Sequence, residues 1–559
     1  MTSTGPNRQL HGVGISPGFA IGRAHVYAEV LPGTAGCDLV GATRIDAEYA
    51  RFERARDSVI EELNGLISRV RGELDIGLAD IFRAHKAILS DPAILREISV
   101  EIERTSATAE QAVQSVLERW KAKFEASTHY LLRDRVDDIE DIRKRLLSTL
   151  MGVRNLIENI PTGSVLIAKR LLPSEIVLLR ERALAGIVIE NCGVASHSAI
   201  LARSMEIPIA AQIPDATEII TTGTMVLVDG IVGRVVIEPD QNRIGGFQER
   251  VNERARVIQL ARERCHQPAV TLDGTNILVM ANAGCVEDVH LGLINGADGI
   301  GLFRLEQFYL SQNDLPLRDK IMGLLRDGLR NVDGKPMTLR LLDAGADKLL
   351  PCLPQRRESN PSLGRRGVRL LLDHAELLSS QLEAMLSLSQ KHTLRILVPM
   401  VTFAQDMRRV REAAERIAQD LRIDTIPQIG AMIETPAAAL CVAEISEFAD
   451  FLSIGTNDLT QYTMAADRDD EFLSDYYVDK HPAIMKLIQH VCSSVRDKEV
   501  SVCGELAGDP EAIPQLLEMG IRHLSVLPLR IPAVKERARN VEMNVNGRTV
   551  DAALNEARR

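Results

Sequence analysis

The chain lacks three features that would each indicate a particular class of protein. No run of apolar residues reaches the roughly 18 residues that a membrane-spanning helix needs, so we expect no membrane segment. The opening stretch MTSTGPNRQLHGVG has no apolar core of the kind found in a secretory signal peptide. The eight cysteines are scattered singly without a CxxC pair, which indicates neither a zinc site nor a disulfide framework. A reducing cytoplasm is therefore the expected location.

The sequence also lacks an excess of basic residues. Its 66 Lys and Arg stand against 77 Asp and Glu, which gives a formal net charge of −11. General nucleic-acid binding requires a positive surface, so we expect no nucleic-acid partner, whereas a basic protein partner is compatible with this charge. The 559 residues, 45% apolar and 26% charged, are typical of a globular protein with two to four domains of roughly 150 residues each.

The texture of the sequence changes several times along the chain. Residues 10–30 read as strand and turn, and a helical stretch rich in charge follows from about 45 to 157. Strand-like runs return in GSVLIAKRLLPSEIVLL, LAGIVIEN and GTMVLVDGIVGRVVIEPD. This order predicts a small α/β domain interrupted by a helical insert, followed by a polar linker helix. We expect the α/β domain at 1–30 and 155–240, the helical domain at 31–154, the linker helix at 241–267, a further α/β domain at 268–540 and a polar tail at 541–559.

The last large domain alternates short apolar runs with helical segments. The runs are TNILVMANA, GADGIGLF, PMTLRLLDA, LRILVPMV, IPQIGAMIE, ADFLSIGTN, VSVCGE and IRHLSVLP. About eight strand–helix units over some 270 residues predict an α/β fold of the (β/α)8 or TIM-barrel type, with an open doubly wound sheet as the alternative.

Polar side chains gather where these predicted strands end. They are Arg304, Arg340, Asp343, Lys348, Arg365, Arg366, Arg369, Glu434, Asn457, Asp458, Arg468, Cys503 and Glu505. Each has an ordinary explanation when taken alone, because a strand-end arginine is commonly a surface ion pair and a lone cysteine is commonly core. In a barrel, however, the carboxyl ends of the strands share one face, and active sites lie there.

The expected composition of that face indicates a small anionic ligand. Arginine guanidinium groups match the oxygens of phosphate and carboxylate in a two-point geometry. Two carboxylates together with ligand oxygens make a magnesium site, because Mg²⁺ prefers oxygen and is usually held through one or two carboxylates. The sequence therefore predicts a ligand that carries both phosphate and carboxylate, bound next to Mg²⁺.

A histidine lies near the start of an apolar helix in the stretch NCGVASHSAILARSMEIPIA, residues 191–210. A helix N-terminus offers unpaired N–H groups and a partial positive charge, which suits an anion. His197 is therefore a candidate carrier of a phosphoryl group, while a purely capping role is the alternative.

Taken together, these motifs resemble the Enzyme I family of the bacterial phosphotransferase system. The resemblance runs from GVGISPGFAIGRA to about residue 540 and is carried by SHSAILARSMEIPIA, LLDAGADK, NPSLGRRGVR, IGAMIETPAAA, FLSIGTNDLTQYTMAADR and CGELAGD, in the family's order. It implies transfer of the phosphoryl group of phosphoenolpyruvate to a histidine and on to a small histidine-containing phosphocarrier protein. It also implies a cytoplasmic homodimer formed through the barrel, with the carrier docked on the helical insert.

The resemblance implies a role for each matching residue. His197 would carry the phosphoryl group on Nε2, and Cys503 would protonate C3 of the leaving enolate. Glu434 and Asp458 would bind Mg²⁺. The residues that would hold phosphoenolpyruvate are Arg304, Arg340, Asn457 and Arg468, with Arg366 as a further contributor.

The sequence departs from the family pattern at several positions next to these residues. Ala195 replaces the family's threonine before Ser196-His197, Ala346 replaces a glycine, and Arg365 replaces a tryptophan. Two other functions stay open. One is an ATP-linked relative such as pyruvate phosphate dikinase or phosphoenolpyruvate synthase, and the other is a regulator that binds phosphoenolpyruvate without turnover. The sequence does not distinguish a sugar-uptake carrier from a nitrogen-related one.

Overall fold

The computed structural model describes most of the chain, which divides into two compact units, residues 1–255 and 256–559. The described residues are 7–27, 45–73, 76–126, 136–152, 160–180, 182–191, 207–310, 312, 314–330, 332, 334–345, 350, 352–353, 358–468, 473, 475–543 and 549–551. Every helix among them is too short or too polar to cross a lipid bilayer.

The first unit is built on one eight-stranded sheet with the order β1-β8-β7-β3-β4-β5-β6-β2. Its strands are β1 (Arg8–His11), β2 (Val13–Ser16), β3 (Phe19–Tyr27), β4 (Val165–Ala168), β5 (Gly186–Ile189), β6 (Ile209–Ala211), β7 (Met225–Asp229) and β8 (Arg234–Ile237). Strand β3 pairs antiparallel with β7 and parallel with β4, so the long insertion between β3 and β4 leaves the sheet and returns to the neighbouring position. All four residues of β4 and of β5 are buried, as expected for central parallel strands.

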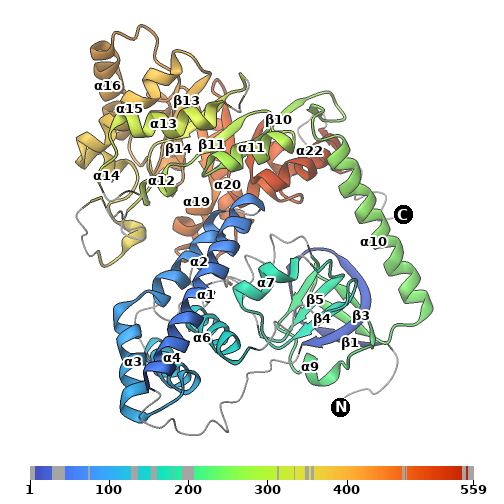
Figure 1. Cartoon of the computed structure of the whole chain (residues 1–559). Coiled ribbons are helices and arrows are strands. Elements are labelled where there is room, and N and C mark those ends of the chain that lie inside the picture. The colour runs from blue at the N-terminus through green and yellow to red at the C-terminus, as the bar shows by residue number, and fades with distance from the viewer. Residues whose placement is uncertain are drawn as a thin grey trace. The chain divides into compact units, whose positions relative to one another are not determined.

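The insertion forms a helical bundle (Figure 1). Its helices are α1 (Ile45–Glu73), α2 (Ile76–Leu89), α3 (Pro92–Thr105), α4 (Ala109–Glu125) and α6 (Val136–Met151). Asp91 caps α3 by accepting the N–H of Ala93 at 2.7 Å, and Thr108 with Gln111 forms a capping box at the start of α4. The apolar face of α3, with Ile94, Ile98 and Ile102 at helical spacing, is buried in the bundle core.

Short helices and one long helix complete this part of the chain. Helices α7 (Pro173–Arg180) and α9 (Ala216–Ile219) follow sheet strands. The long helix α10 (Gln241–Glu263) begins after β8 and runs past the division between the two units. Within the first unit, Phe247 of α10 packs edge-on against Phe19, with ring centroids 5.4 Å apart.

The second unit contains a closed barrel of eight parallel strands. They are β10 (Asn276–Ala283), β11 (Ile300–Phe303), β12 (Met337–Arg340), β13 (Leu394–Val398), β14 (Ile429–Ile433), β15 (Leu452–Gly455), β16 (Val500–Cys503) and β17 (His523–Val526). Strand β10 pairs with both β11 and β17, which closes the ring. The predicted α/β fold with a (β/α)8 barrel is therefore confirmed, and the open sheet is wrong.

Helices surround the barrel because its strands are apolar on both faces (Figure 1). Those of eight or more residues are α11 (Val286–Ile294), α13 (Arg318–Leu329), α15 (Ala375–Ser389), α16 (Ala404–Leu421), α19 (Thr456–Met464), α20 (Pro482–Ser494) and α22 (Ile531–Arg539). Shorter helices are α12 (Glu306–Leu310), α14 (Val368–Asp373), α17 (Pro436–Leu440), α18 (Val442–Ser446) and α21 (Ile513–Glu518). Strand β9 (Ala269–Val270) pairs antiparallel with β10, and β18 (Val541–Met543) with β19 (Thr549–Asp551).

An ion cluster joins strands at the amino-terminal end of the barrel. Glu499, one residue before β16, accepts from Arg395 of β13 at 2.6 and 3.0 Å and lies 2.9 Å from Nδ1 of His523 in β17. The Arg395 guanidinium also lies over the ring of Phe451, 5.1 Å from its centroid. Burial raises the pKa of Glu499, but the bonds to His523 and Arg395 outweigh it and lower this pKa to about 2.

This cluster predicts a stability difference that depends on pH. The pKa of Glu499 in the folded protein lies below its ordinary value of 4.5. Its contribution to the free energy of unfolding is therefore present in full above about pH 4.5 and is lost as the pH falls toward 2. Glu499→Gln should lower the free energy of unfolding at pH 7 by on the order of 2 kcal/mol. Thermal unfolding of the wild type and of Glu499→Gln between pH 3 and 7 measures the difference in stability. A difference that stays constant over this pH range contradicts the lowered pKa of Glu499.

Candidate active site

The predicted site residues of the barrel lie at the carboxyl ends of five strands. Arg304 follows β11, Arg340 ends β12 and Glu434 follows β14. Asn457 and Asp458 begin α19 directly after β15, and Cys503 ends β16. Parallel strands in one barrel direct these ends to the same face, so residues up to 200 positions apart in the sequence are brought together.

Arg340 is held by two carboxylates inside the barrel. Its Nη2 donates to Oε1 of Glu306 at 2.9 Å, and its Nη1 lies 3.3 Å from Oδ2 of Asp343. Burial lowers the pKa of Arg340, but the surrounding carboxylates outweigh it and raise this pKa, so the guanidinium is charged. Its buried Nε–H has no hydrogen-bond partner among the described residues. Burying a hydrogen-bond donor without an acceptor costs free energy. An oxygen of a bound ligand would supply that acceptor.

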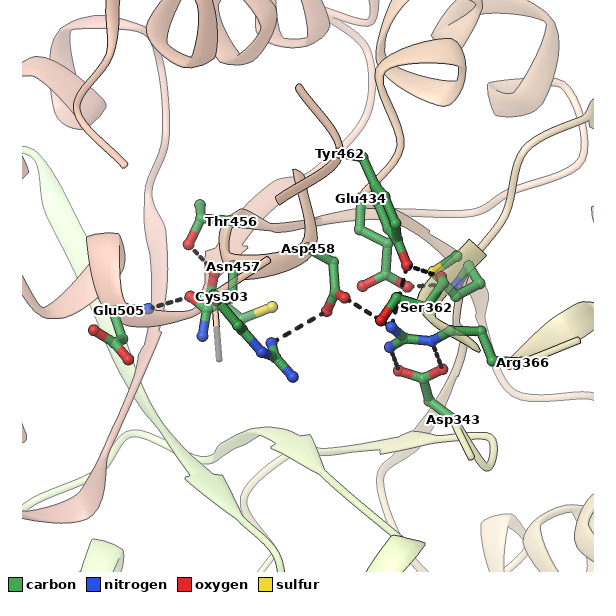
Figure 2. A network of polar contacts seen from close by, with 12 residues as sticks. Asp343, Ser362, Arg366, Glu434, Thr456, Asn457, Asp458, Tyr462, Cys503 and Glu505 are labelled. Atoms are coloured by element: carbon green, nitrogen blue, oxygen red, sulfur yellow. Dashed lines mark hydrogen bonds and ion pairs between the residues drawn. The ribbon is translucent and has the colours of Figure 1, made fainter. Parts of the chain in front are cut away.

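Arg366 forms the second buried arginine cluster. Its Nε and Nη2 donate to the two oxygens of Asp343 at 3.2 and 2.8 Å, and its Nη1 donates to Asp458 at 3.0 Å. Tyr462 accepts from the same Nη1 at 3.2 Å and donates to the carbonyl of Ser362 at 2.6 Å. Figure 2 shows Asp458 between the Arg366–Asp343 pair on one side and Asn457 and Cys503 on the other.

Two further carboxylates are almost completely buried here. Glu434 is 1% exposed and Asp458 is 7% exposed. Burial, and then the charges of Asp458 and Asp343, raise the pKa of Glu434. One oxygen of Glu434 accepts the N–H of Met400 at 2.5 Å. Two repelling carboxylates in a buried site are an oxygen donor pair suited to a hard divalent cation. The described residues contain no group of three or more His, Cys, Asp or Glu side chains that would hold a metal unaided.

The Cys503 thiol lies at the same face and is 2% exposed. Its Sγ donates to the carbonyl of Ile454 at 3.4 Å and lies 3.7 Å from the hydroxyl of Ser453. Burial raises the pKa of Cys503 to about 11, although the charges of Arg340 and Arg304 act in the opposite direction. At neutral pH this side chain is therefore a thiol, which can donate a proton and is a poor nucleophile.

The start of α19 is tied to the turn after β16. Asn457 Oδ1 accepts the N–H of Glu505 at 2.9 Å, and Thr456 donates to the carbonyl of Cys503 at 3.0 Å (Figure 2). Gly504 has φ 102°, and a Cβ there would lie 2.3 Å from Oγ1 of Thr456, so the turn requires glycine. Arg468 follows α19 and its Nη1 lies 3.8 Å from Asp458.

Not every residue noted in the sequence belongs to this site. Arg365 is exposed and pairs with Asp373 at 3.3 Å. Arg369 of α14 donates to the carbonyls of Leu363 and Gly364, which precede that helix, and to Thr402. His197 and Lys348 lie outside the described residues. Glu306 and Tyr462 belong to these clusters although the sequence predicts no role for either, and the one signal for Glu306 is its position two residues after Arg304.

Comparison with known proteins agrees with this arrangement. Three family descriptions match: the N-terminal region of PEP-utilising enzymes over residues 11–135, their mobile domain over 160–233 and their PEP-binding domain over 259–543. A phosphoenolpyruvate-protein phosphotransferase of Bacillus sp. (strain S) is 36% identical over 557 residues, which cover 96% of this chain and 95% of the relative. The chain belongs to the phosphoenolpyruvate-protein phosphotransferase family.

Other members of the phosphoenolpyruvate-protein phosphotransferase family align over similar lengths. The protein of Geobacillus stearothermophilus is 36% identical over 96% of this chain and 95% of its own length. That of Haemophilus influenzae is 33% identical over 98% of this chain and 96% of its own length. The matched PEP-binding domain contains the whole barrel face described above.

The burial of Cys503 predicts how its thiol reacts. Iodoacetamide attacks the thiolate, so at pH 8 we expect Cys503 to be alkylated at least about a hundredfold more slowly than the exposed Cys441. The Cys503 rate should rise about tenfold for each pH unit up to pH 9.5 without a plateau. Mass spectrometry of peptides from the native protein measures both rates. Alkylation of Cys503 as fast as that of Cys441 contradicts the structure.

Proposed function

We propose that this protein transfers the phosphoryl group of phosphoenolpyruvate to its own His197, and then to a small histidine-containing phosphocarrier protein. This is the first step of a sugar phosphotransferase system and releases pyruvate. The observation that carries the proposal is the buried Nε–H of Arg340, which has no partner in the described part of the chain and lies among carboxylates at the barrel face. A phosphate or carboxylate oxygen is the natural acceptor for that donor. Membership in the family supports the same reaction.

Four arginines and an asparagine would bind the substrate. Arg304, Arg340 and Asn457 stand at the carboxyl ends of strands or directly after them, whereas Arg366 and Arg468 lie farther along the segments that follow β12 and β15. Positioning and charge neutralisation are the main demands of phosphoryl transfer, and fixed guanidinium groups meet both. Since Arg366 already pairs with Asp343 and Asp458, we assign it a smaller share of substrate binding than Arg340.

Glu434 and Asp458 would hold Mg²⁺. The fit rests on the donor set, because both groups are carboxylates and burial together with the charge of Asp458 raises the pKa of Glu434. A bound Mg²⁺ would neutralise charge on the transferring phosphoryl group. The proposed ligand set is completed by oxygens of the substrate and by water, since Mg²⁺ usually takes only one or two carboxylates from the protein.

In the proposed reaction the bond between Nε2 of His197 and phosphorus forms as the bond from phosphorus to the enol oxygen breaks. Neutral imidazole is the nucleophile, since the ordinary histidine pKa is about 6.5. The enolate of pyruvate then takes a proton at C3 from Sγ of Cys503, and solvent later restores the thiol. The raised pKa of Cys503 suits this role, because the proton is present at neutral pH.

The partners and location of the protein are part of the proposal. We infer a homodimer formed through the barrel, a phosphocarrier docked on the helical insert, and a cytoplasmic location. Resemblance to the family supports all three, and the six cysteines that the structure describes are free thiols.

Labelling with radioactive phosphoenolpyruvate and Mg²⁺ tests the activity. We expect acid-labile, base-stable label on the wild-type chain and none on His197→Ala, because phosphohistidine is the proposed intermediate. Label from ATP instead would favour the dikinase-like function. A chain that binds phosphoenolpyruvate but takes up no label would favour a regulator. Transfer of the label to a panel of purified phosphocarriers identifies the acceptor.

A further inference from the structure

Glu306 is a buried carboxylate to which the proposed reaction gives no role. It begins α12, is 6% exposed, and stands two residues after Arg304. A single oxygen, Oε1, accepts two hydrogen bonds, one from Nη2 of Arg340 at 2.9 Å and one from the N–H of Asp343 at 2.8 Å. Glu306 thereby joins the start of α12 to both the side chain at the end of β12 and the backbone that follows it.

These contacts restrict what Arg340 can do. Of its three nitrogens, Nη2 is occupied by Glu306, and Nη1 is directed to Asp343 at 3.3 Å and to the sulfur of Met432 at 3.7 Å. Nε is the one nitrogen of Arg340 without a hydrogen-bond partner among the described residues. Since a long arginine side chain otherwise has several rotamers, the bond to Glu306 selects the one that keeps this donor available.

Glu306 also matters for the second arginine. Asp343 carries one charge, yet both of its oxygens already accept from Arg366 at 3.2 and 2.8 Å. Without the charge of Glu306, Arg340 and Arg366 would compete for Asp343. With Glu306 as a second buried carboxylate, each guanidinium has a charge partner of its own and the two do not compete for Asp343.

We propose that Glu306 is a positioning residue for phosphoenolpyruvate binding, which holds Arg340 so that its Nε–H is presented to an oxygen of the substrate. The inference rests on the proposed function. A merely structural role would lower stability without changing the affinity for the substrate, and the two are separable by experiment.

The test uses the full chain with His197→Ala as the parent, so that phosphoenolpyruvate binds without losing its phosphoryl group. Calorimetric titration with phosphoenolpyruvate and Mg²⁺ gives Kd for the parent and for added Glu306→Gln and Glu306→Ala. We expect Kd to rise in that order, by about tenfold for alanine, which corresponds to about 1.4 kcal/mol. Glutamine should have the smaller effect because its amide oxygen can still accept both hydrogen bonds.

Glu499→Ala in the same background is the matched control. This substitution breaks another arginine–glutamate pair of the barrel, Arg395–Glu499. That pair is half-buried and lies at the amino-terminal end of the strands, opposite the proposed site. We expect it to lower the melting temperature and leave Kd unchanged.

If the Glu306 variants change only the melting temperature, as the control does, the positioning role is wrong. Should Glu306→Ala fail to fold, the Glu306→Gln variant decides. A rise in its Kd of about threefold or more supports the positioning role, and an unchanged Kd overturns it. A parent that does not bind phosphoenolpyruvate would instead overturn the proposed function.

Discussion

The sharing of Asp343 between two buried arginines is the constraint on which the barrel site depends. Arg366 takes both oxygens of this carboxylate, while Arg340 lies 3.3 Å away and obtains its closest charge partner from Glu306. Buried guanidinium groups are stable only with such compensation. Since these carboxylates contact Arg340 through Nη1 and Nη2, its Nε–H keeps no partner among the described residues and is available to an oxygen of a ligand.

The barrel makes this cluster possible by placing strand ends side by side. Its strands close through β10, so the residues that follow β11, β12, β14, β15 and β16 meet at one rim. At the other end, Glu499 links β13, β16 and β17 through Arg395 and His523. The proposed binding site and the Glu499 cluster thus lie at opposite ends of the barrel, and active sites in this fold lie at the carboxyl ends of the strands.

Much of this site could be predicted from the sequence, because an apolar run followed by a polar residue marks the end of a strand. Glu434 and Cys503 are placed by that reasoning alone. The bond between Glu306 and Arg340 could not be, since it joins residues 34 positions apart whose side-chain conformations depend on packing. Arg365 and Arg366 are adjacent residues of the same type, yet Arg365 is exposed and Arg366 is buried, and residue type alone does not tell which of the two side chains enters the barrel site.

The role of Arg340 is measured most directly in a crystal structure of the full-length His197→Ala variant with phosphoenolpyruvate and Mg²⁺ bound. We expect an oxygen of the ligand within about 3 Å of Nε of Arg340, with Glu306 still bound to Nη2 and with Asp343 still bound to Arg366. A ligand bound elsewhere, or one bound here while the Arg340 Nε–H keeps no partner, would contradict it.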